Sequence, residues 1–155
     1  MEKQNNYSIH IKTNNPILNN HDFPEIVLMI CKMAKETENK SLNEKKVTDA
    51  VLNFISNKIF GQYFLIVDNS KKSFCGMNMI TYEYNINSNK TIVWLQSVFI
   101  EKEYRMKKLF KSLLEENENF VRTSTNFEQK VKLYMEKNNS TAERLTHTHH
   151  LKGFT

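Results

Sequence analysis

The sequence lacks long apolar runs and an apolar segment behind its first methionine. A transmembrane helix needs about 18 or more consecutive apolar residues, and a secretory signal needs an apolar stretch near the N-terminus. These absences argue against a membrane span and a signal peptide, so we expect a cytoplasmic or nuclear protein. Only three glycines are present among 155 residues rich in Asn and Lys, which we interpret as compositional bias without functional meaning.

Cysteines are also few, and their placement excludes a disulfide framework. Cys31 and Cys75 lie far apart in apolar contexts, which predicts buried free thiols in a reducing compartment. Histidines cluster only at His147, His149 and His150, with no carboxylate or cysteine nearby to complete a metal site. The spacing is not that of a zinc-binding helix motif, so we predict no metal and a solvated helix end.

The composition is that of one globular domain, assigned to residues 1–155. Hydrophobic residues make up 39% of the chain and aromatic residues 11%, enough for a single core. The net charge of +5 suits a polyanionic partner, either a nucleic acid or a phosphate-rich cofactor. Because the lysines are scattered rather than massed in one block, a solvated surface explains much of this surplus.

Apolar spacing alternates between strand and helix periods along the chain. Asp22 with Glu25, and Ser41 with Glu44, have the spacing of capping boxes and predict two helix starts. Short polar turns between three later apolar runs predict consecutive antiparallel strands. The resulting order, β-α-α-β-β-β-α-β-α, indicates an α/β or α+β domain. The predicted strands are 7–11, 62–67, 74–84, 91–100 and 130–136, and the predicted helices are 22–35, 41–55, 106–121 and 140–151.

Several segments in this order resemble a known family. Trp94–Ile100 followed by Glu103–Phe110 is similar to the fourth strand and third helix of the GNAT superfamily of N-acetyltransferases. Gly76–Tyr84 resembles its third strand, and Leu133–Ala142 its fifth strand and the start of its fourth helix. The resemblance implies a mixed, mostly antiparallel sheet flanked by helices. It also implies transfer of an acetyl group from acetyl-CoA to an amine.

The central motif implies a phosphate-binding turn. Unpaired backbone N–H groups and the partial positive charge at a helix N-terminus bind anions. In the family pattern Q/R-x-x-G-x-G/A, Arg105 matches the first position, whereas Lys108 and Phe110 replace the two glycines. Neighbouring lysines could compensate by charge, and an ordinary basic helix start is the alternative. The turn assigned to the CoA pyrophosphate comprises Arg105, Met106, Lys107, Lys108, Leu109 and Phe110.

The resemblance also assigns the pantetheine arm of acetyl-CoA to two places. Its backbone pairing partner would be the strand segment Val98, Phe99 and Ile100, because such strand addition requires main-chain groups rather than particular side chains. An amide here would polarise the thioester carbonyl. Asn139 stands three residues before Ala142 and would bond the arm. It could equally cap a helix.

Acid and base candidates are less well marked. Glu83 is the predicted general base, with Gln96 on the neighbouring strand as an orienting residue; an exposed strand-end carboxylate is the alternative for Glu83. The family acid is a tyrosine on helix four, and its position falls on Thr146 or His149 depending on the direction of counting. Of these two, only His149 could donate a proton to the leaving thiolate.

The family pattern continues beyond the point where this sequence ends, with one or two further strands. We therefore expect the final strands to be missing and strand five to lie at an edge, where a second copy in a homodimer could complete the sheet. Three functions stay open: a catalytic N-acetyltransferase, a non-catalytic CoA-binding or interaction module, and a nucleic-acid-binding protein, which only net charge favours. The acceptor would be a small-molecule or peptide amine.

Overall fold

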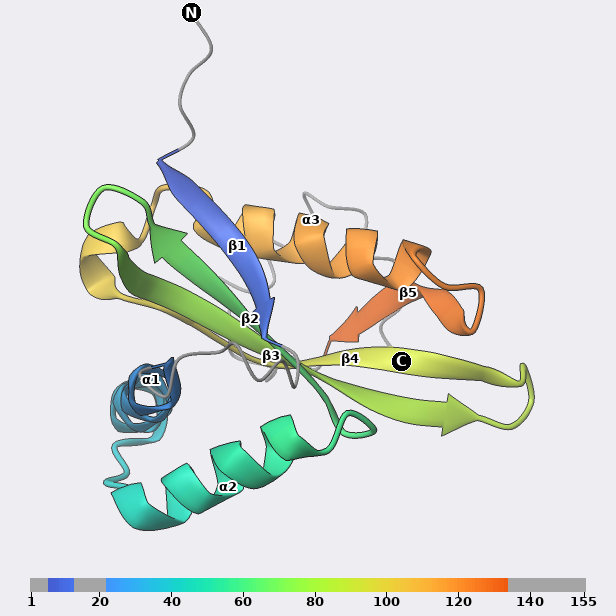
Figure 1. Cartoon of the computed structure of the whole chain (residues 1–155), viewed down its shortest axis with the longest axis horizontal. Helices are drawn as coiled ribbons and strands as arrows, with labels where there is room; N and C mark the ends of the chain where they lie inside the picture. Colours follow the sequence, from blue (N-terminus) through green and yellow to red (C-terminus); the bar gives the residue numbers. More distant parts are fainter. Residues whose placement is uncertain (1–5, 13–21, 134–155) are drawn as a thin grey trace, which may run out of the picture.

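The computed structural model describes residues 6–12 and 22–133 of the chain. The described elements follow the predicted order through the fifth strand, with an added 3-10 turn before the third long helix (Figure 1). They are β1 (Tyr7–Lys12), α1 (Asp22–Glu38), α2 (Glu44–Ser56), β2 (Gly61–Asp68), β3 (Ser73–Asn85), β4 (Lys90–Ile100), the 3-10 turn η1 (Lys102–Tyr104), α3 (Leu109–Arg122) and β5 (Phe127–Leu133).

One five-stranded sheet organises the fold, with its strands in the order β1-β2-β3-β4-β5. The first four strands pair antiparallel, as the short connections predict. The pairing of β4 with β5 is parallel, because α3 carries the chain back along the sheet between them. The mixed, mostly antiparallel sheet expected from the sequence is thus confirmed.

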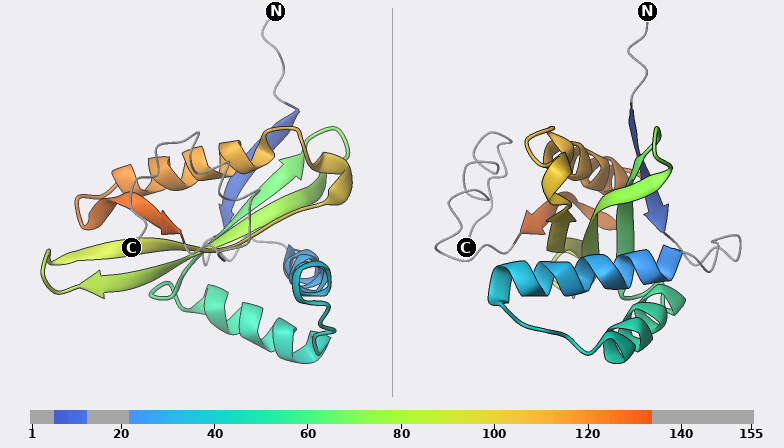
Figure 2. Two further views of the ribbon diagram at one scale, coloured as in Figure 1. Left: turned by 180° about the vertical axis from the view of Figure 1, so that it is seen from behind. Right: turned by 90° about the vertical axis from the view of Figure 1, so that its left-hand side faces the viewer.

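Helices cover both faces of the sheet. Figures 1 and 2 show α3 on one face and the pair α1 and α2 on the other. On the α3 side, Phe64, Leu113 and Val121 belong to a buried apolar cluster. On the opposite side, Ile26 and Val51 pack with side chains of β2, β3 and β4. These two apolar layers bury the faces of the sheet and fix β4 between them.

Four predicted boundaries are wrong. The first helix continues to Glu38 rather than ending at residue 35. The second helix begins at Glu44 rather than near Ser41, because the side chain of Asn43 accepts a hydrogen bond from the Lys46 amide at 3.0 Å and caps the helix itself. The third long helix begins at Leu109 rather than residue 106. The fifth strand begins at Phe127 rather than residue 130.

The predicted helix 140–151 and the end of the chain lie outside the described residues. Within the described part, no helix is long and apolar enough to cross a bilayer. The described residues also include no group of three or more His, Cys, Asp or Glu side chains that could hold a metal ion. Both cysteines are free: Cys75 is buried, which raises the pKa of its thiol to about 11, whereas Cys31 is only half-buried.

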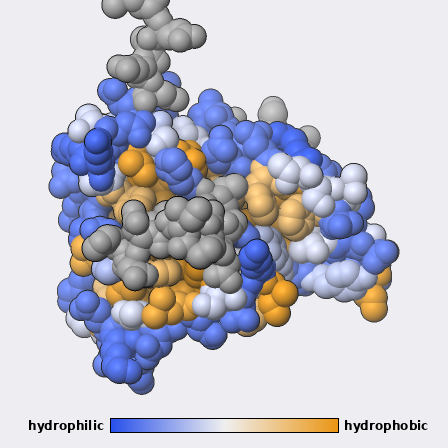
Figure 3. Space-filling model, in the orientation of Figure 1, coloured by the Kyte–Doolittle hydropathy of each residue, from blue (hydrophilic) through white to orange (hydrophobic). Residues whose placement is uncertain are grey.

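The face of the molecule shown in Figure 3 is mainly hydrophilic, with several apolar patches. Ile86, in the β3–β4 turn, is 82% exposed, and Met106, just before α3, is fully exposed. Single exposed apolar side chains are normal on soluble proteins.

Candidate functional site

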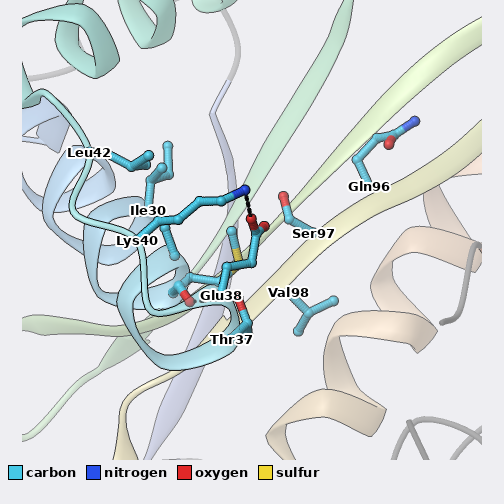
Figure 4. A pocket seen from close by; sticks show the side chains of 10 residues that line it. Ile30, Thr37, Glu38, Lys40, Leu42, Gln96, Ser97 and Val98 are labelled. Atoms are coloured by element: carbon cyan, nitrogen blue, oxygen red, sulfur yellow. Dashed lines mark hydrogen bonds and ion pairs between the residues drawn. The ribbon is translucent and has the colours of Figure 1, made fainter. Parts of the chain in front are cut away.

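A pocket of about 410 Å³ lies between the C-terminal end of α1, the segment that follows it, and β4 (Figure 4). Pockets of this size suit small-molecule ligands. Its walls are apolar on the α1 side and polar where the end of α1 faces β4. The residues that line it are Ile30, Met33, Ala34, Thr37, Glu38, Lys40, Leu42, Gln96, Ser97 and Val98.

The end of α1 shapes one wall of this pocket. Asn39 adopts a left-handed conformation with φ of 50°, which ends the helix. The Lys40 amide then donates to the Ala34 carbonyl at 3.2 Å, so the chain folds back over the last turn of the helix. This turn brings Lys40 against Glu38, and the two side chains form an ion pair beside the pocket (Figure 4).

A β-bulge in β4 shapes the facing wall. Leu95 lies opposite Ile80 and Ser97 lies opposite Met79, so Gln96 is an extra residue with no backbone pairing partner on β3. Bulges re-aim side chains and often occur beside active sites. Here the bulge brings the consecutive residues Gln96 and Ser97 to the pocket.

Beyond the bulge, alternate backbone groups of β4 point away from β3. The Glu101 amide donates to the Cys75 carbonyl at 2.9 Å, which makes 101 and 75 a hydrogen-bonded pair. Because bonded and non-bonded pairs alternate in antiparallel strands, the N–H and C=O groups of Val98 and Ile100 face the other side. The recorded pairing with β5 ends at Leu95, so no described strand takes up these groups.

The turn before α3 has a backbone suited to glycine. Met106 and Lys108 both have left-handed conformations, with φ of 66° and 60°. Lys108, which occupies a glycine position of the family pattern, is the N-cap residue and its side chain makes no capping bond. The first turn of α3 carries no acidic residue, so its free amides and Lys111 present a positive surface to an anion.

Arg105 joins this turn to the rest of the site. Its Nε atom donates to the Ile100 carbonyl at 2.7 Å, and its terminal nitrogen pairs with Glu36 at 2.6 Å. A second ion pair, Lys32 with Glu101 at 2.6 Å, lies one helical turn earlier on α1. These contacts hold α1, and with it the pocket wall, against the segment that links β4 to α3.

Tyr104 anchors the same segment to the β2–β3 turn. Its hydroxyl donates to Asp68 at 2.7 Å, and both Lys71 and Lys107 lie over its ring, 5.4 and 5.2 Å from the centroid. The hydroxyl of Ser70, followed by that of Tyr104, holds the pKa of the buried Asp68 at about 2, below its ordinary 3.8. Asp68 therefore stays ionised near neutral pH.

We expect Asp68→Asn to remove a pH dependence of stability in the acid range. Because the folded-state pKa is depressed, the stabilisation is complete above pH 3.8 and is lost as the pH falls toward about 2. Urea unfolding of the wild type and the variant across this pH range measures their free energies of unfolding. The difference between the two free energies should become smaller as the pH falls. A difference in unfolding free energy between wild type and Asp68→Asn that stays constant with pH would contradict the prediction.

The structure separates the predicted acid–base residues. Gln96 lines the pocket and donates to the Thr81 hydroxyl at 2.8 Å. Glu83 is exposed and not among the described residues that line the pocket; its carboxylate accepts a hydrogen bond from the Trp94 indole, not from Gln96. Asn139 and His149 lie outside the described residues. The roles predicted for all four residues stay predictions.

The sequence did not point to the polar residues at the end of α1. Thr37, Glu38 and Lys40 line the pocket, but they follow a regular amphipathic helix and belong to no motif. Ser97 also lines the pocket, because the bulge shifts it there. A single sequence gives no signal for a bulge between two apolar runs.

No family model matches the chain, and no curated protein matches it. Among solved structures, a possible acetyltransferase from Clostridium difficile 630 has a TM-score of 0.83 and 26% identity, covering 96% of this chain and 92% of that one. A GNAT family acetyltransferase from Staphylococcus aureus subsp. aureus USA300_TCH1516 has a TM-score of 0.67 and 18% identity, covering 87% and 90%. The chain has the GNAT acetyltransferase fold.

A third structure is an aminoglycoside acetyltransferase, meta-AAC0020, from an uncultured soil metagenomic sample in complex with sisomicin. Its TM-score is 0.72 at 15% identity, with 96% of this chain and 89% of that one covered. The structure at 26% identity is named as a possible acetyltransferase, which supports an acyltransferase activity, and acetyl transfer in general, for this chain. The other two structures show the shared fold. They do not specify an acceptor for it.

Proposed function

We propose that this protein is an N-acetyltransferase that moves the acetyl group of acetyl-CoA to a primary amine by direct attack in a ternary complex. The observation that carries the proposal is one continuous path of backbone. It runs from Val98, which lines the pocket, through the outward-facing Ile100 to the left-handed turn at Lys108. A thioester carrier and an amine could meet along this path.

The residues of the path fit acetyl-CoA. A pyrophosphate would lie against the first-turn amides of α3, with Lys107 and Lys108 as charge partners. Lys108 has a left-handed backbone conformation, which glycine adopts most readily, so the lysine occupies a position whose backbone would also suit glycine and adds a positive charge there. The pantetheine arm would pair with the outward-facing N–H and C=O of Val98 and with the N–H of Ile100, since the Ile100 carbonyl already accepts from Arg105. We assign Asn139 to the same arm.

In the reaction, the bound cosubstrate supplies an activated acetyl thioester. The Val98 N–H points away from β3 and would donate to the thioester carbonyl, stabilising negative charge that develops on its oxygen. The amine nitrogen must lose a proton before its lone pair attacks, and the leaving thiolate must gain one. We assign the base to Glu83, acting through water because it lies outside the pocket lining, and the acid to His149. Gln96 is bonded to Thr81 and not to Glu83, so it lines the acceptor pocket rather than orienting the base.

The acceptor would be a small molecule that fits the pocket beside Gln96 and Ser97. The pocket volume and the small-molecule complex of the aminoglycoside acetyltransferase both favour this class over a folded protein surface. We place the enzyme in the cytoplasm, as one domain. A homodimer that completes the sheet beyond β5 is part of the same proposal, and its test is the oligomeric state in solution.

Acetyl-CoA binding measured by calorimetry tests the proposal. The wild type should bind with micromolar affinity, and Arg105→Ala should weaken binding about tenfold because a guanidinium–phosphate contact is lost. Arg105 also anchors Glu36, so Glu36→Gln is the matched control. It breaks the same ion pair while leaving the guanidinium, and we expect its affinity to equal or exceed that of the wild type.

Each outcome has a defined meaning. Equal losses in both variants would show that Arg105 acts by positioning α1 and not as a phosphate ligand. Binding without transfer to any amine in an acceptor screen would favour the alternative, a non-catalytic CoA-binding module. A folded wild type that does not bind acetyl-CoA would refute the enzyme assignment.

A further inference from the structure

The acceptor pocket holds one carboxylate among the described residues that line it, that of Glu38. The side chain of Glu38 is paired with Lys40, the one basic side chain in the same lining. In Figure 4 the two charged groups meet beside the Ser97 side chain, which projects from β4. The Lys40 ammonium therefore occupies the place beside Glu38 that a ligand cation would take.

Helix α1 adds to the negative character of this position. Its last turn contributes Thr37 and Glu38 to the pocket wall. The C-terminal end of a helix carries a partial negative charge from its unpaired carbonyl groups, which favours a cation. The Glu38 carboxylate and the end of a 17-residue helix thus act in the same direction.

The contact with Lys40 is weak enough to be displaced. The side chains of Glu38 and Lys40 are 55% and 65% exposed. Exposed ion pairs contribute little to stability, because water and salt screen the charges. A ligand ammonium that also buries apolar surface can therefore replace Lys40 at Glu38.

The rest of the lining limits the number of charges on the ligand. Ile30, Met33 and Leu42 form apolar walls, and no second carboxylate among the described lining residues could pair with another ammonium. The protein carries a net charge of +5, which disfavours a polycation further. Apolar walls with a single anionic group match an amine of one positive charge and an apolar body.

We propose that Glu38 binds the ammonium group of the acceptor, in place of Lys40, and selects small monocationic amines with an apolar body. The bound ammonium then passes one proton through water to the base before the nitrogen lone pair attacks the thioester. This inference rests on the proposed N-acetyltransferase function and names the substrate class of the same pocket. Glu38 is then a substrate-binding residue, and Lys40 an internal competitor that lowers the apparent affinity for the acceptor.

The proposed role of Glu38 is tested by steady-state acetyl transfer, measured near neutral pH at saturating acetyl-CoA. The probes are benzylamine, a monocation; aniline, a neutral amine of similar size; and sisomicin, a polycation. Glu38→Gln should raise KM for benzylamine about tenfold or more, since a charge-assisted hydrogen bond is lost. Its KM for aniline should change less than about twofold, and wild-type kcat/KM should be higher for benzylamine than for sisomicin.

Two further variants sharpen the test. Lys40→Met should lower KM for benzylamine about two- to fivefold, and this gain should vanish in the Glu38→Gln background because the competitor acts through Glu38. Glu25→Gln removes the same charge from the other end of α1 and should leave every KM unchanged. Calorimetric acetyl-CoA binding equal to wild type confirms that each variant is folded.

A benzylamine KM in Glu38→Gln within about twofold of wild type would overturn the inference while leaving the proposed function intact. A wild-type preference for sisomicin over benzylamine would overturn the substrate class. A protein that binds no acetyl-CoA, or acetylates no amine, would refute the proposed function itself, and the inference with it.

Discussion

The double variant Lys107→Glu, Lys108→Glu is expected to bind acetyl-CoA at least about 100-fold more weakly than the wild type. Both lysines precede the first turn of α3, whose unpaired amides are the proposed pyrophosphate site. Reversing two charges removes two attractions and adds two repulsions beside an anion. At about 1 kcal/mol for each of these four terms, the combined effect exceeds about 2.7 kcal/mol, or about 100-fold. Calorimetry measures it directly.

The control for this variant keeps the same change in net charge. Lys45→Glu, Lys46→Glu alters two lysines in the first turn of α2, on the opposite face of the sheet from α3. Its acetyl-CoA affinity should stay within about threefold of wild type at physiological salt, where the Debye length is about 8 Å. Equal losses in both double variants would show that the overall field, and not this turn, governs binding.

Lys108→Gly separates backbone conformation from charge at the same turn. The left-handed conformation of Lys108 costs about 1–2 kcal/mol that glycine avoids, while glycine loses more entropy on folding. We therefore expect the variant to be as stable as the wild type or slightly more stable. Its acetyl-CoA affinity should fall by no more than about tenfold, the contribution of one charge.

The turn before α3 shows what sequence reasoning could and could not predict. The resemblance assigns a phosphate-binding turn to residues 105–110, which stays a prediction, and Lys108, at a glycine position of the family pattern, has a left-handed conformation that glycine adopts readily. The helix was predicted over residues 106–121 because Leu109, Leu113, Leu114 and Phe120 fall on one face. Spacing cannot reveal that Met106 and Lys108 leave the helical region, since lysine and methionine are ordinary helix formers.

The pocket was less predictable than the sheet. Strands β2, β3 and β4 were predicted to within one residue at each end, because apolar and β-branched residues bounded by polar turns specify them locally. The contact between Glu38 and Lys40 depends on the single left-handed residue Asn39. The contact between α1 and the β4 bulge depends on tertiary packing. Neither has a periodic signal, so the candidate acceptor carboxylate becomes visible only in the structure.

The β4 bulge itself leads to a second large expected effect, at Gly61. Gly61 has a φ of 155°, and a Cβ atom added there would lie 1.9 Å from the carbonyl oxygen of Ile80. Ile80 borders the register shift that makes Gln96 the extra residue of β4. Gly61→Ala must therefore displace β2 from β3 at the point where β3 supports the pocket wall.

We expect Gly61→Ala to destabilise the fold by at least about 3 kcal/mol, because the clash is with backbone and the φ is unfavourable for alanine. Gly76→Ala is the matched control: its nearest contacts would be at 3.0 Å, one of them the movable end of the Ile66 side chain, so we expect a loss of about 1 kcal/mol. Urea unfolding measures both losses of stability.

Since Ile80 lies opposite Leu95, the residual folded Gly61→Ala protein should also show a raised acceptor KM at low temperature. Equal, small losses in the two variants would mean that β2 and β3 can separate at Gly61 without cost, and that the bulge does not depend on this glycine.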